Sequence, residues 1–182
     1  MALSPIEFNT VLQSGQTTTE QALALFDSLP AVDLAFMLGR WRGSGFPTDH
    51  PMDGFLEAAR WYGKEFVTPD AVHPLLFSDG SGNIYKVAPN PTLMKWVLQM
   101  PLPKSDAAQP LYVALNTLLK TDDPQARLRM MEHRGQVSAT MIYDHLPIHD
   151  VFKQVDEDTV LGVMDYKESP QPFFFVLRRD RQ

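Results

Sequence analysis

Near the start of the chain, the hydrophobic pattern has the period of a helix. Four apolar residues share one face at this spacing: Ala22, Leu25, Phe26 and Leu29. Residues 19–29 are therefore predicted to form an N-terminal helix, capped by Thr18 or Thr19 and ended by Pro30. A shorter helix is expected behind Asp53 as its N-cap, because apolar residues recur there at helical spacing until Gly63.

The segment 37–46 is predicted to be the first strand, and its glycines set it apart. Trp41 lies two residues from both Gly39 and Gly43, and Gly45 follows. Glycine inside a strand usually marks a bulge, a bend or a close approach of the backbone. We therefore expect a strongly coiled strand whose tryptophan closes one end of a rolled-up sheet.

From residue 127 onward the pattern changes to short strands at close, regular spacing. The predicted strands are 128–132, 137–143, 149–155, 159–166 and 173–178. Shorter strands are expected earlier, at Phe66, at 75–77 and at 84–87, with a hairpin turn at 79–83. This series predicts a mainly β fold with α elaborations: an antiparallel meander β-barrel of the calycin or lipocalin-like kind.

A proline-rich segment, 91–120, separates the early strands from the late ones. Residues 91–100 fit both helical and strand periodicity, and Asn90-Pro91 favours a helix because proline suits a helix start. The stripe behind Pro110 is more clearly helical. The helical insert could close a core, cover the barrel mouth as a lid, or touch a membrane surface transiently through 91–119, where Lys95, Lys104 and Lys120 flank it. We predict one domain over 1–182, with parts 30–90, 91–120 and 121–182.

Composition narrows the classes of function. The 182 residues carry a net charge of −6, which argues against nucleic-acid binding. The absence of cysteine excludes disulfides and thiolate metal sites. The first residues do not look like a secretory signal, and no apolar run approaches the length of a membrane span. We expect a soluble cytoplasmic protein, and exposed strand edges and the apolar insert make a homodimer plausible.

Several motifs resemble a known bacterial family. They include Gly39-Arg40-Trp41-Arg42-Gly43, Trp61-Tyr62-Gly63-Lys64, His73-Pro74-Leu75-Leu76-Phe77, Arg134-Gly135-Gln136-Val137-Ser138-Ala139 and Met141-Ile142-Tyr143-Asp144. The chain is similar over residues 30–180 to the family named for its Gly-x-Trp-x-Gly motif and to its companion domain of unknown function. This resemblance implies no activity. The first strand is also similar to that of lipocalin-like and nitrobindin-like barrels; the latter hold haem through a histidine, and no histidine here aligns with that ligand.

A barrel interior either packs solidly or leaves room for one small ligand. The residues expected to point inward are Trp41, Phe46, Met130, Ala139, Met141, Phe152, Leu161, Val163, Phe173 and Phe175. Nine methionines and eleven phenylalanines favour an adaptable apolar cavity. We therefore predict binding of a fatty-acyl or similar apolar metabolite. The predicted ligand-binding residues are Trp41, Arg134, Met141, Tyr143, His145, Phe152, Phe173 and Phe175.

The polar residues of the late strands leave alternatives open. Arg134, Tyr143 or His145 could meet the polar head of a ligand, or such groups could simply satisfy strand ends. An enzyme on the same scaffold would use His145, Tyr143 and Asp165 for acid–base chemistry. No metal site is predicted, because Pro147 argues against a helix that would align His145 with His149. No cofactor is expected, with haem as the alternative.

Overall fold

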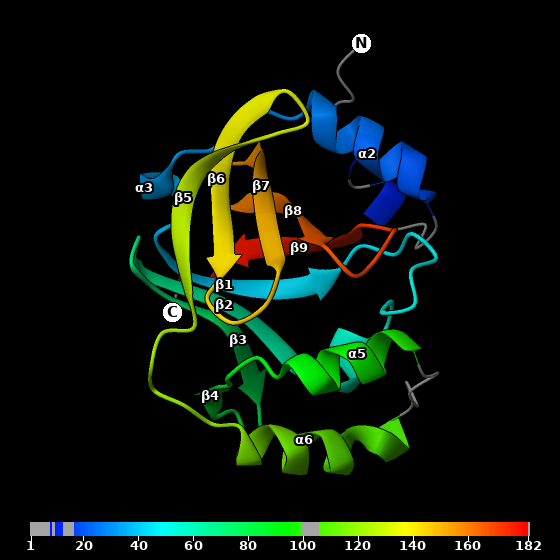
Figure 1. Ribbon diagram of the computed structural model, residues 1–182, viewed down its shortest axis with the longest axis vertical. Coiled ribbons are helices and arrows are strands. Elements are labelled where there is room, and N and C mark those ends of the chain that lie inside the picture. Colours follow the sequence, from blue (N-terminus) through cyan, green and yellow to red (C-terminus); the bar gives the residue numbers. More distant parts are fainter. Residues whose placement is uncertain (1–7, 9, 13–16, 100–105, 182) are drawn as a thin grey trace.

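The structure, a computed structural model, describes residues 8, 10–12, 17–99 and 106–181, and in these residues nine strands form one antiparallel sheet (Figure 1). Their bounds are β1 (Gly39–Gly45), β2 (Trp61–Thr68), β3 (Ala71–Ser78), β4 (Ile84–Lys86), β5 (Ala126–His133), β6 (Gln136–Tyr143), β7 (Ile148–Asp156), β8 (Thr159–Tyr166) and β9 (Phe173–Arg179). The ring runs β2-β1-β9-β8-β7-β6-β5-β3 and closes through pairing of β2 with β3, while β4 extends from β3. The predicted antiparallel meander barrel is confirmed.

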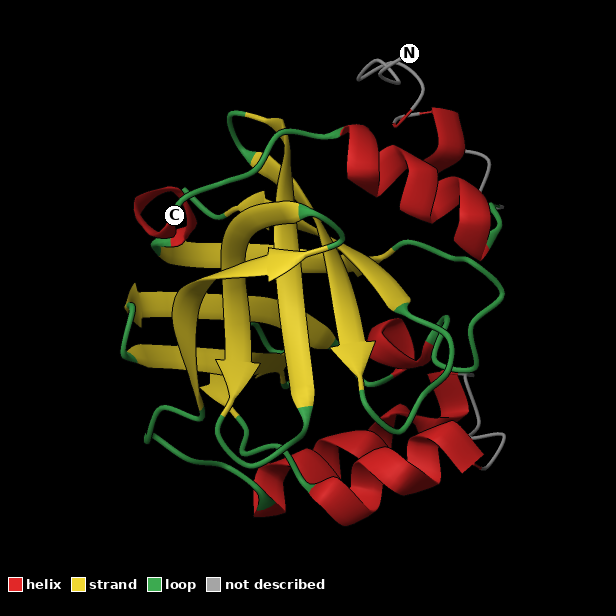
Figure 2. Cartoon of the chain, turned by 45° about the horizontal axis from the view of Figure 1, so that its top comes forward, coloured by secondary structure: helices red, strands yellow, loops and turns green. Residues whose placement is uncertain are grey.

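Helices lie outside the ring and across one of its ends. They are α2 (Thr19–Ser28), α3 (Leu34–Met37), α4 (Phe55–Ala58), α5 (Pro91–Gln99), the short 3-10 helix η1 (Asp106–Ala108) and α6 (Gln109–Leu118). Figure 2 shows the longer helices of the insert lying across the end of the sheet, whereas α2 packs on the outer wall. The insert therefore covers one opening of the barrel.

The alternation of side chains divides the apolar residues into two cores. Trp41, Phe66 and Phe152 belong to the core inside the ring. The second core lies between α2 and the outer face of the sheet, and it holds Phe8, Phe26, Phe46, Leu161, Val163, Phe174 and Val176, among others. Each strand of this wall thus has two buried faces, so β8 and β9 read as continuous apolar runs.

Four of the expected inward residues do not point inward. Phe46, Leu161 and Val163 lie in the outer core beneath α2, and Met130 is 42% exposed. A strand buried on both faces gives no polar alternation from which to choose its inward side, and a shift of one residue exchanges the two faces. The inward positions of β8 are instead Val160, Gly162 and Met164, because Val160 and Met164 lie in the inner core and a Cβ at Gly162 would meet Phe175.

The predicted helices are mostly confirmed, and two details differ. Thr18 caps α2 through a capping box with Gln21. Asp53 does not cap α4; Gly54 is the N-cap, while the Asp53 carboxylate accepts from the backbone N–H groups of Thr48 and His50. The pattern also missed α3, a single turn capped by Asp33. Residues 91–99 are helical, and Met100 and Lys104 lie outside the described residues.

Within the described residues, no helix combines the length and the apolar character that crossing a membrane requires.

Candidate functional site

An apolar pocket occupies the barrel end that the helical insert covers. Its volume is about 100 Å³. The barrel contributes lining residues from β2, β3, β6, β7, β8 and β9, and α4, α5 and α6 contribute the other side. Representative lining residues are Phe55, Leu75, Leu93, Tyr112, Leu115 and Phe173. The pocket is therefore built between the barrel and the insert, and neither forms it alone.

A buried ion pair crosses the barrel where the pocket meets the packed core. Lys64 Nζ lies 2.8 Å from Asp150 Oδ2, and both side chains are nearly inaccessible to solvent. Lys64 is on β2 and Asp150 on β7, which are separated by three strands in either direction around the ring. Because these strands face each other across the interior, the pair spans the barrel and forms the floor of the pocket.

Lys64 has further partners around the same point. Its ammonium group donates to the Pro74 carbonyl oxygen at 3.2 Å and to the Tyr143 hydroxyl at 3.4 Å. It also lies 5.0 Å from the centre of the Phe175 ring and 5.6 Å from the Trp61 and Tyr143 rings. A buried ammonium is tolerated only when it is paired in this way.

Burial sets the protonation behaviour of the acidic groups in the floor. Desolvation raises the pKa of Asp150, and the nearby Lys64 charge and hydrogen bond partly oppose this. The pKa of Tyr143 lies well above its usual range, because the ring is buried and Asp150 is negatively charged nearby. Tyr143 therefore keeps its hydroxyl proton at neutral pH and can act as a hydrogen-bond donor.

Three buried polar atoms of lining residues lack a hydrogen-bond partner. These are Oδ1 of Asp150, an acceptor, and two donors, Nε1 of Trp61 and Nδ2 of Asn116. Asp150 is 1% exposed and Trp61 is 9% exposed. Most buried polar groups in folded proteins are hydrogen-bonded, and leaving one unpaired costs roughly 1–3 kcal/mol. The pocket lining thus presents one acceptor and two donors that a bound molecule could satisfy.

An irregularity in β2 places both Trp61 and Lys64 at the pocket. Residues three apart in a regular strand point to opposite faces. Here the pairing of β2 with β3 shifts register between Trp61 and Gly63 and again between Gly63 and Glu65. Gly63 has a φ of 147°, and a Cβ there would lie 1.9 Å from the Trp41 carbonyl oxygen. Glycine at this position therefore lets β2 press against β1 and turn both side chains inward.

The neighbouring glycine on β1 makes room for the Trp61 ring. A Cβ on Gly43 would lie 2.1 Å from that indole. The second glycine of the Gly-x-Trp-x-Gly motif is thus required by the pocket, while Trp41 between the glycines faces the interior.

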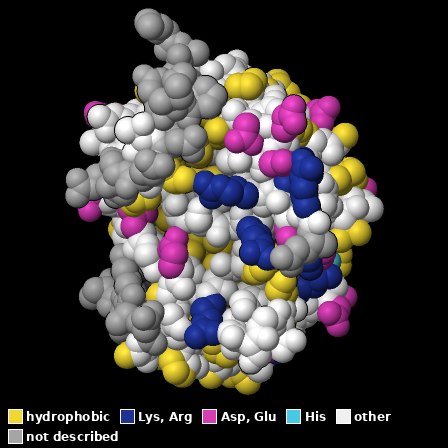
Figure 3. All heavy atoms as spheres, turned by 180° about the vertical axis from the view of Figure 1, so that it is seen from behind, with side chains coloured by type: hydrophobic (Ala, Val, Ile, Leu, Met, Phe, Trp, Pro, Cys, Tyr) yellow, Lys and Arg dark blue, Asp and Glu magenta, His cyan; other side chains and the backbone are white. Residues whose placement is uncertain are grey.

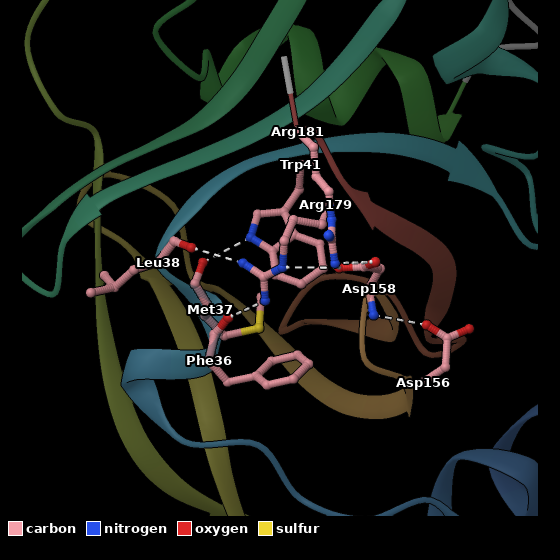
Figure 4. A network of polar contacts seen from close by, with 8 residues as sticks. All are labelled: Phe36, Met37, Leu38, Trp41, Asp156, Asp158, Arg179 and Arg181. Atoms are coloured by element: carbon pink, nitrogen blue, oxygen red, sulfur yellow. Dashed lines mark hydrogen bonds and ion pairs between the residues drawn. The ribbon is translucent and has the colours of Figure 1, made fainter.

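The opposite end of the barrel is closed by Trp41 (Figure 4). This side chain is fully buried, and its indole N–H donates to the Met37 carbonyl oxygen at 2.8 Å. The Arg179 guanidinium lies 4.2 Å from the indole and donates to the carbonyl oxygens of Phe36 and Leu38. Arg179 also faces Asp158 at 3.5 Å. Position and contacts agree with the expectation that this tryptophan closes one end.

Of the predicted site residues, only part lies at the pocket. Tyr143, Phe173 and Phe175 line it. Trp41, Met141 and Phe152 were also predicted to bind the ligand, but they are fully buried in the inner core and do not line the pocket. The sequence analysis did not place Trp61, Lys64 or Asp150 in the site, and a regular strand would point Trp61 and Lys64 to opposite faces. Lys64 and Asp150 lie on different strands, so no local sequence pattern indicates that they form a pair.

The remaining predicted residues lie away from the pocket. Arg134 is in the β5–β6 turn, where it forms an ion pair with Asp27 of α2 at 2.6 Å. His145 and Asp165 are exposed and do not line the pocket, whereas Tyr143 is buried and lines it. Single-sequence reasoning placed these residues near one another only because neighbouring strands carry them.

The histidines do not fit a haem or metal site in this pocket. The described residues that line it include no histidine. Across the described part of the chain, no group of three or more His, Asp or Glu side chains is arranged to hold a metal ion. His145 is exposed, while the buried His50 accepts a hydrogen bond from the Met52 backbone N–H through Nδ1. A nitrobindin-like haem ligand is therefore missing from the pocket lining.

Charged residues of the outer wall are largely paired with one another. Arg40 lies 2.8 Å from Asp180, and Arg181 lies 2.6 Å from Asp158. Figure 3 shows Lys and Arg side chains beside Asp and Glu side chains on the rear face. Absence of nucleic-acid binding and formation of a homodimer stay predictions.

Comparisons with known proteins match both halves of the barrel. The family model described as GXWXG protein matches residues 24–82, and the Domain of unknown function (DUF4334) matches residues 124–179. The crystal structure of a protein from Thermomonospora curvata is 33% identical, covers 97% of this chain and 98% of its own, and superposes with a TM-score of 0.71. No curated protein matched the chain.

These matches also describe how the pocket is assembled. The two matched segments contribute strands to one ring, and the Lys64–Asp150 ion pair joins them across its interior. The insert that covers the pocket lies between the matched segments. The chain is a member of the GXWXG family, with the DUF4334 domain forming the later strands of its barrel.

Proposed function

We propose that this protein binds a small, mostly apolar molecule in the pocket between the barrel end and the helical insert. One observation carries the proposal: the pocket is apolar, yet its lining includes the buried and unpartnered Asp150 Oδ1 and Trp61 Nε1. Its volume of about 100 Å³ is several times the roughly 10–15 Å³ that one water molecule needs. Apolar pockets with a few convergent polar groups are typical of small-molecule sites.

The shape of the site suggests how such a molecule would lie. Its apolar part would contact Phe55, Leu75, Leu93 and Leu115, and its polar end would reach the floor near Asp150. A fatty-acyl or related metabolite has this division between tail and head. A soluble, cytoplasmic carrier of such a metabolite is the function we favour.

The helical insert is the proposed route of entry. Leu111 and Leu118 of α6 are 57% and 82% exposed, and Leu115 of the same helix lines the pocket. An apolar surface that continues into an apolar pocket suits transfer of a ligand from a membrane surface. Transient contact through 91–119 is part of the proposal.

Binding is tested by filling the pocket. Native mass spectrometry of protein purified from its own host would show a retained molecule, and Nile red fluorescence would report apolar binding. Ala59 lines the pocket and is buried, so an Ala59→Phe variant should lose both signals. Ala114 of α6 is exposed, and Ala114→Phe is the matched control. Equal Nile red binding by the two variants would contradict the proposal.

A second function, acid–base catalysis in the same cavity, is favoured by the raised pKa of Asp150. Such an enzyme would use Asp150 and Tyr143, which share the floor, rather than the exposed His145 and Asp165. It predicts that a captured ligand changes mass on incubation with the protein and that Asp150→Asn stops the change while the ligand still binds. A ligand recovered unaltered would leave binding as the function.

A further inference from the structure

The hydrogen-bonding inventory of the pocket floor limits which head groups it can accept. A lysine ammonium has three N–H donors. Those of Lys64 have three oxygen acceptors: Oδ2 of Asp150, the Pro74 carbonyl and the Tyr143 hydroxyl. Lys64 is therefore not available as a counter-ion for an incoming anion unless it gives up one of these partners.

The charges of the floor also balance. Lys64 and Asp150 neutralise each other in a nearly solvent-free environment. No other Lys, Arg, Asp or Glu side chain belongs to the described lining of the pocket. A carboxylate head would therefore place a second negative charge beside Asp150, and an ammonium head would place a second positive charge beside Lys64. Burying an unpaired charge is far more costly than burying a neutral group.

The unsatisfied atoms fit a neutral head group instead. Oδ1 of Asp150 needs a donor, and Nε1 of Trp61 and Nδ2 of Asn116 each need an acceptor. Tyr143 accepts from Lys64 through its oxygen, which leaves its own O–H to donate. A hydroxyl or a primary amide both donates and accepts, so either can serve the free acceptor and a free donor at once.

We propose that the pocket selects ligands with an uncharged head that both donates and accepts hydrogen bonds, an alcohol or a primary amide, over the corresponding carboxylate or amine. This inference rests on the proposed function, since it specifies the ligand class of the same pocket. It also narrows that function from fatty-acyl metabolites in general to neutral ones. A free fatty acid, ionised at neutral pH, would be a poor ligand.

The test compares ligands that share a tail. Calorimetric titration of the full chain at pH 7 would measure binding of 1-octanol, octanamide, octanoate and octylamine. We expect the alcohol and the amide to bind at least about tenfold more tightly than either charged ligand, the size expected when a buried polar group is left unpaired. Octanoate or octylamine binding as tightly as 1-octanol would overturn the head-group inference and leave the binding function standing. Failure of all four ligands, together with failure of Nile red, would overturn the binding function itself.

A variant of Trp61 tests the geometry. Trp61→Phe keeps an aromatic ring beside Gly43 and Phe175 but removes the indole N–H. We expect it to reduce the preference for 1-octanol over octylamine about threefold to tenfold, because the hydroxyl loses one donor. Tyr62→Phe is the matched control: Tyr62 is the next residue on β2, and its hydroxyl donates to Asp180 on the outer wall. A preference that is unchanged in Trp61→Phe, or reduced equally in Tyr62→Phe, would contradict the inference.

Discussion

The two ends of this barrel each hold a tryptophan beside a cation, and they differ in how completely these groups are satisfied. At the closed end, the Trp41 N–H donates to Met37, and Arg179 donates to two backbone carbonyl oxygens. At the covered end, the Trp61 N–H and one oxygen of Asp150 have no partner. The first arrangement is complete within the chain, whereas the second leaves polar atoms that the proposed ligand would satisfy.

Under the proposed function, this difference assigns stability to one end of the barrel and ligand binding to the other. Phe66 and Phe152 pack edge to face in the inner core, and both are fully buried. Substitutions at the closed end should change the free energy of unfolding with little effect on ligands. Substitutions at the covered end should change ligand affinity, except where they leave a buried charge without its partner.

That exception gives the largest expected effect. Asp150→Ala should lower the free energy of unfolding by about 3–5 kcal/mol, because Lys64 is left charged and unpaired in the interior. The double variant Lys64→Met/Asp150→Leu removes both charges and should be much less destabilised, although it should lose head-group selectivity. Urea unfolding of both proteins measures the difference. If the double variant is as unstable as the single one, the ion pair is not an isolated unit spanning the barrel.

A smaller effect is expected at Gly43, where the backbone of β1 meets the Trp61 ring. Gly43→Ala should cost about 1–3 kcal/mol, because the new Cβ would sit 2.1 Å from the indole and force it to move. The displaced ring should also alter Nile red binding. Gly82→Ala is the contrasting variant, since no atom lies within 4 Å of a Cβ placed there. The positive φ of Gly82 means that alanine adds backbone strain, but Nile red binding in the pocket should be unchanged. Nile red binding equal to that of the native chain in Gly43→Ala would contradict the proposed packing.

Replacing each tryptophan by phenylalanine compares the two ends directly. Trp41→Phe should lower the free energy of unfolding by about 1–2 kcal/mol, since it leaves the buried Met37 carbonyl oxygen without its donor. Trp61→Phe should cost less, because no hydrogen bond within the protein is lost. Thermal unfolding of the two ligand-free variants provides the measurement. A larger loss for Trp61→Phe would mean that the covered end is also built mainly for stability.

The sequence supported the fold better than the site, and particular residues show why. Regular spacing of turns and apolar runs predicts the β5–β9 meander, and the glycines around Trp41 predict a coiled first strand. The alternation of apolar and polar residues cannot show which face of β8 points into the barrel, because both of its faces are buried. The inward position of Lys64 could not be predicted, because the strand is irregular at Gly63. Its partner Asp150 is on a strand across the ring. Local periodicity carries no information about such long-range pairs.

The smallest effect concerns Arg134, which the sequence placed at the ligand head and the structure places outside the barrel. Its ion pair with Asp27 lowers the pKa of that carboxyl, first through their side-chain hydrogen bond. Because the folded-state pKa of Asp27 is depressed, the pair adds stability above the ordinary Asp value of about 3.9 and loses it as pH falls through the folded-state value. Both side chains are about 40% exposed, so solvent screening limits the contribution to about 0.5 kcal/mol. Asp27→Asn should therefore have a slightly lower free energy of unfolding than the native chain at pH 7. Urea unfolding at a series of pH values should show this difference disappear at the most acidic pH. Arg134→Ala should behave alike and leave binding of 1-octanol unchanged, and a weakened affinity in that variant would restore Arg134 to the ligand site.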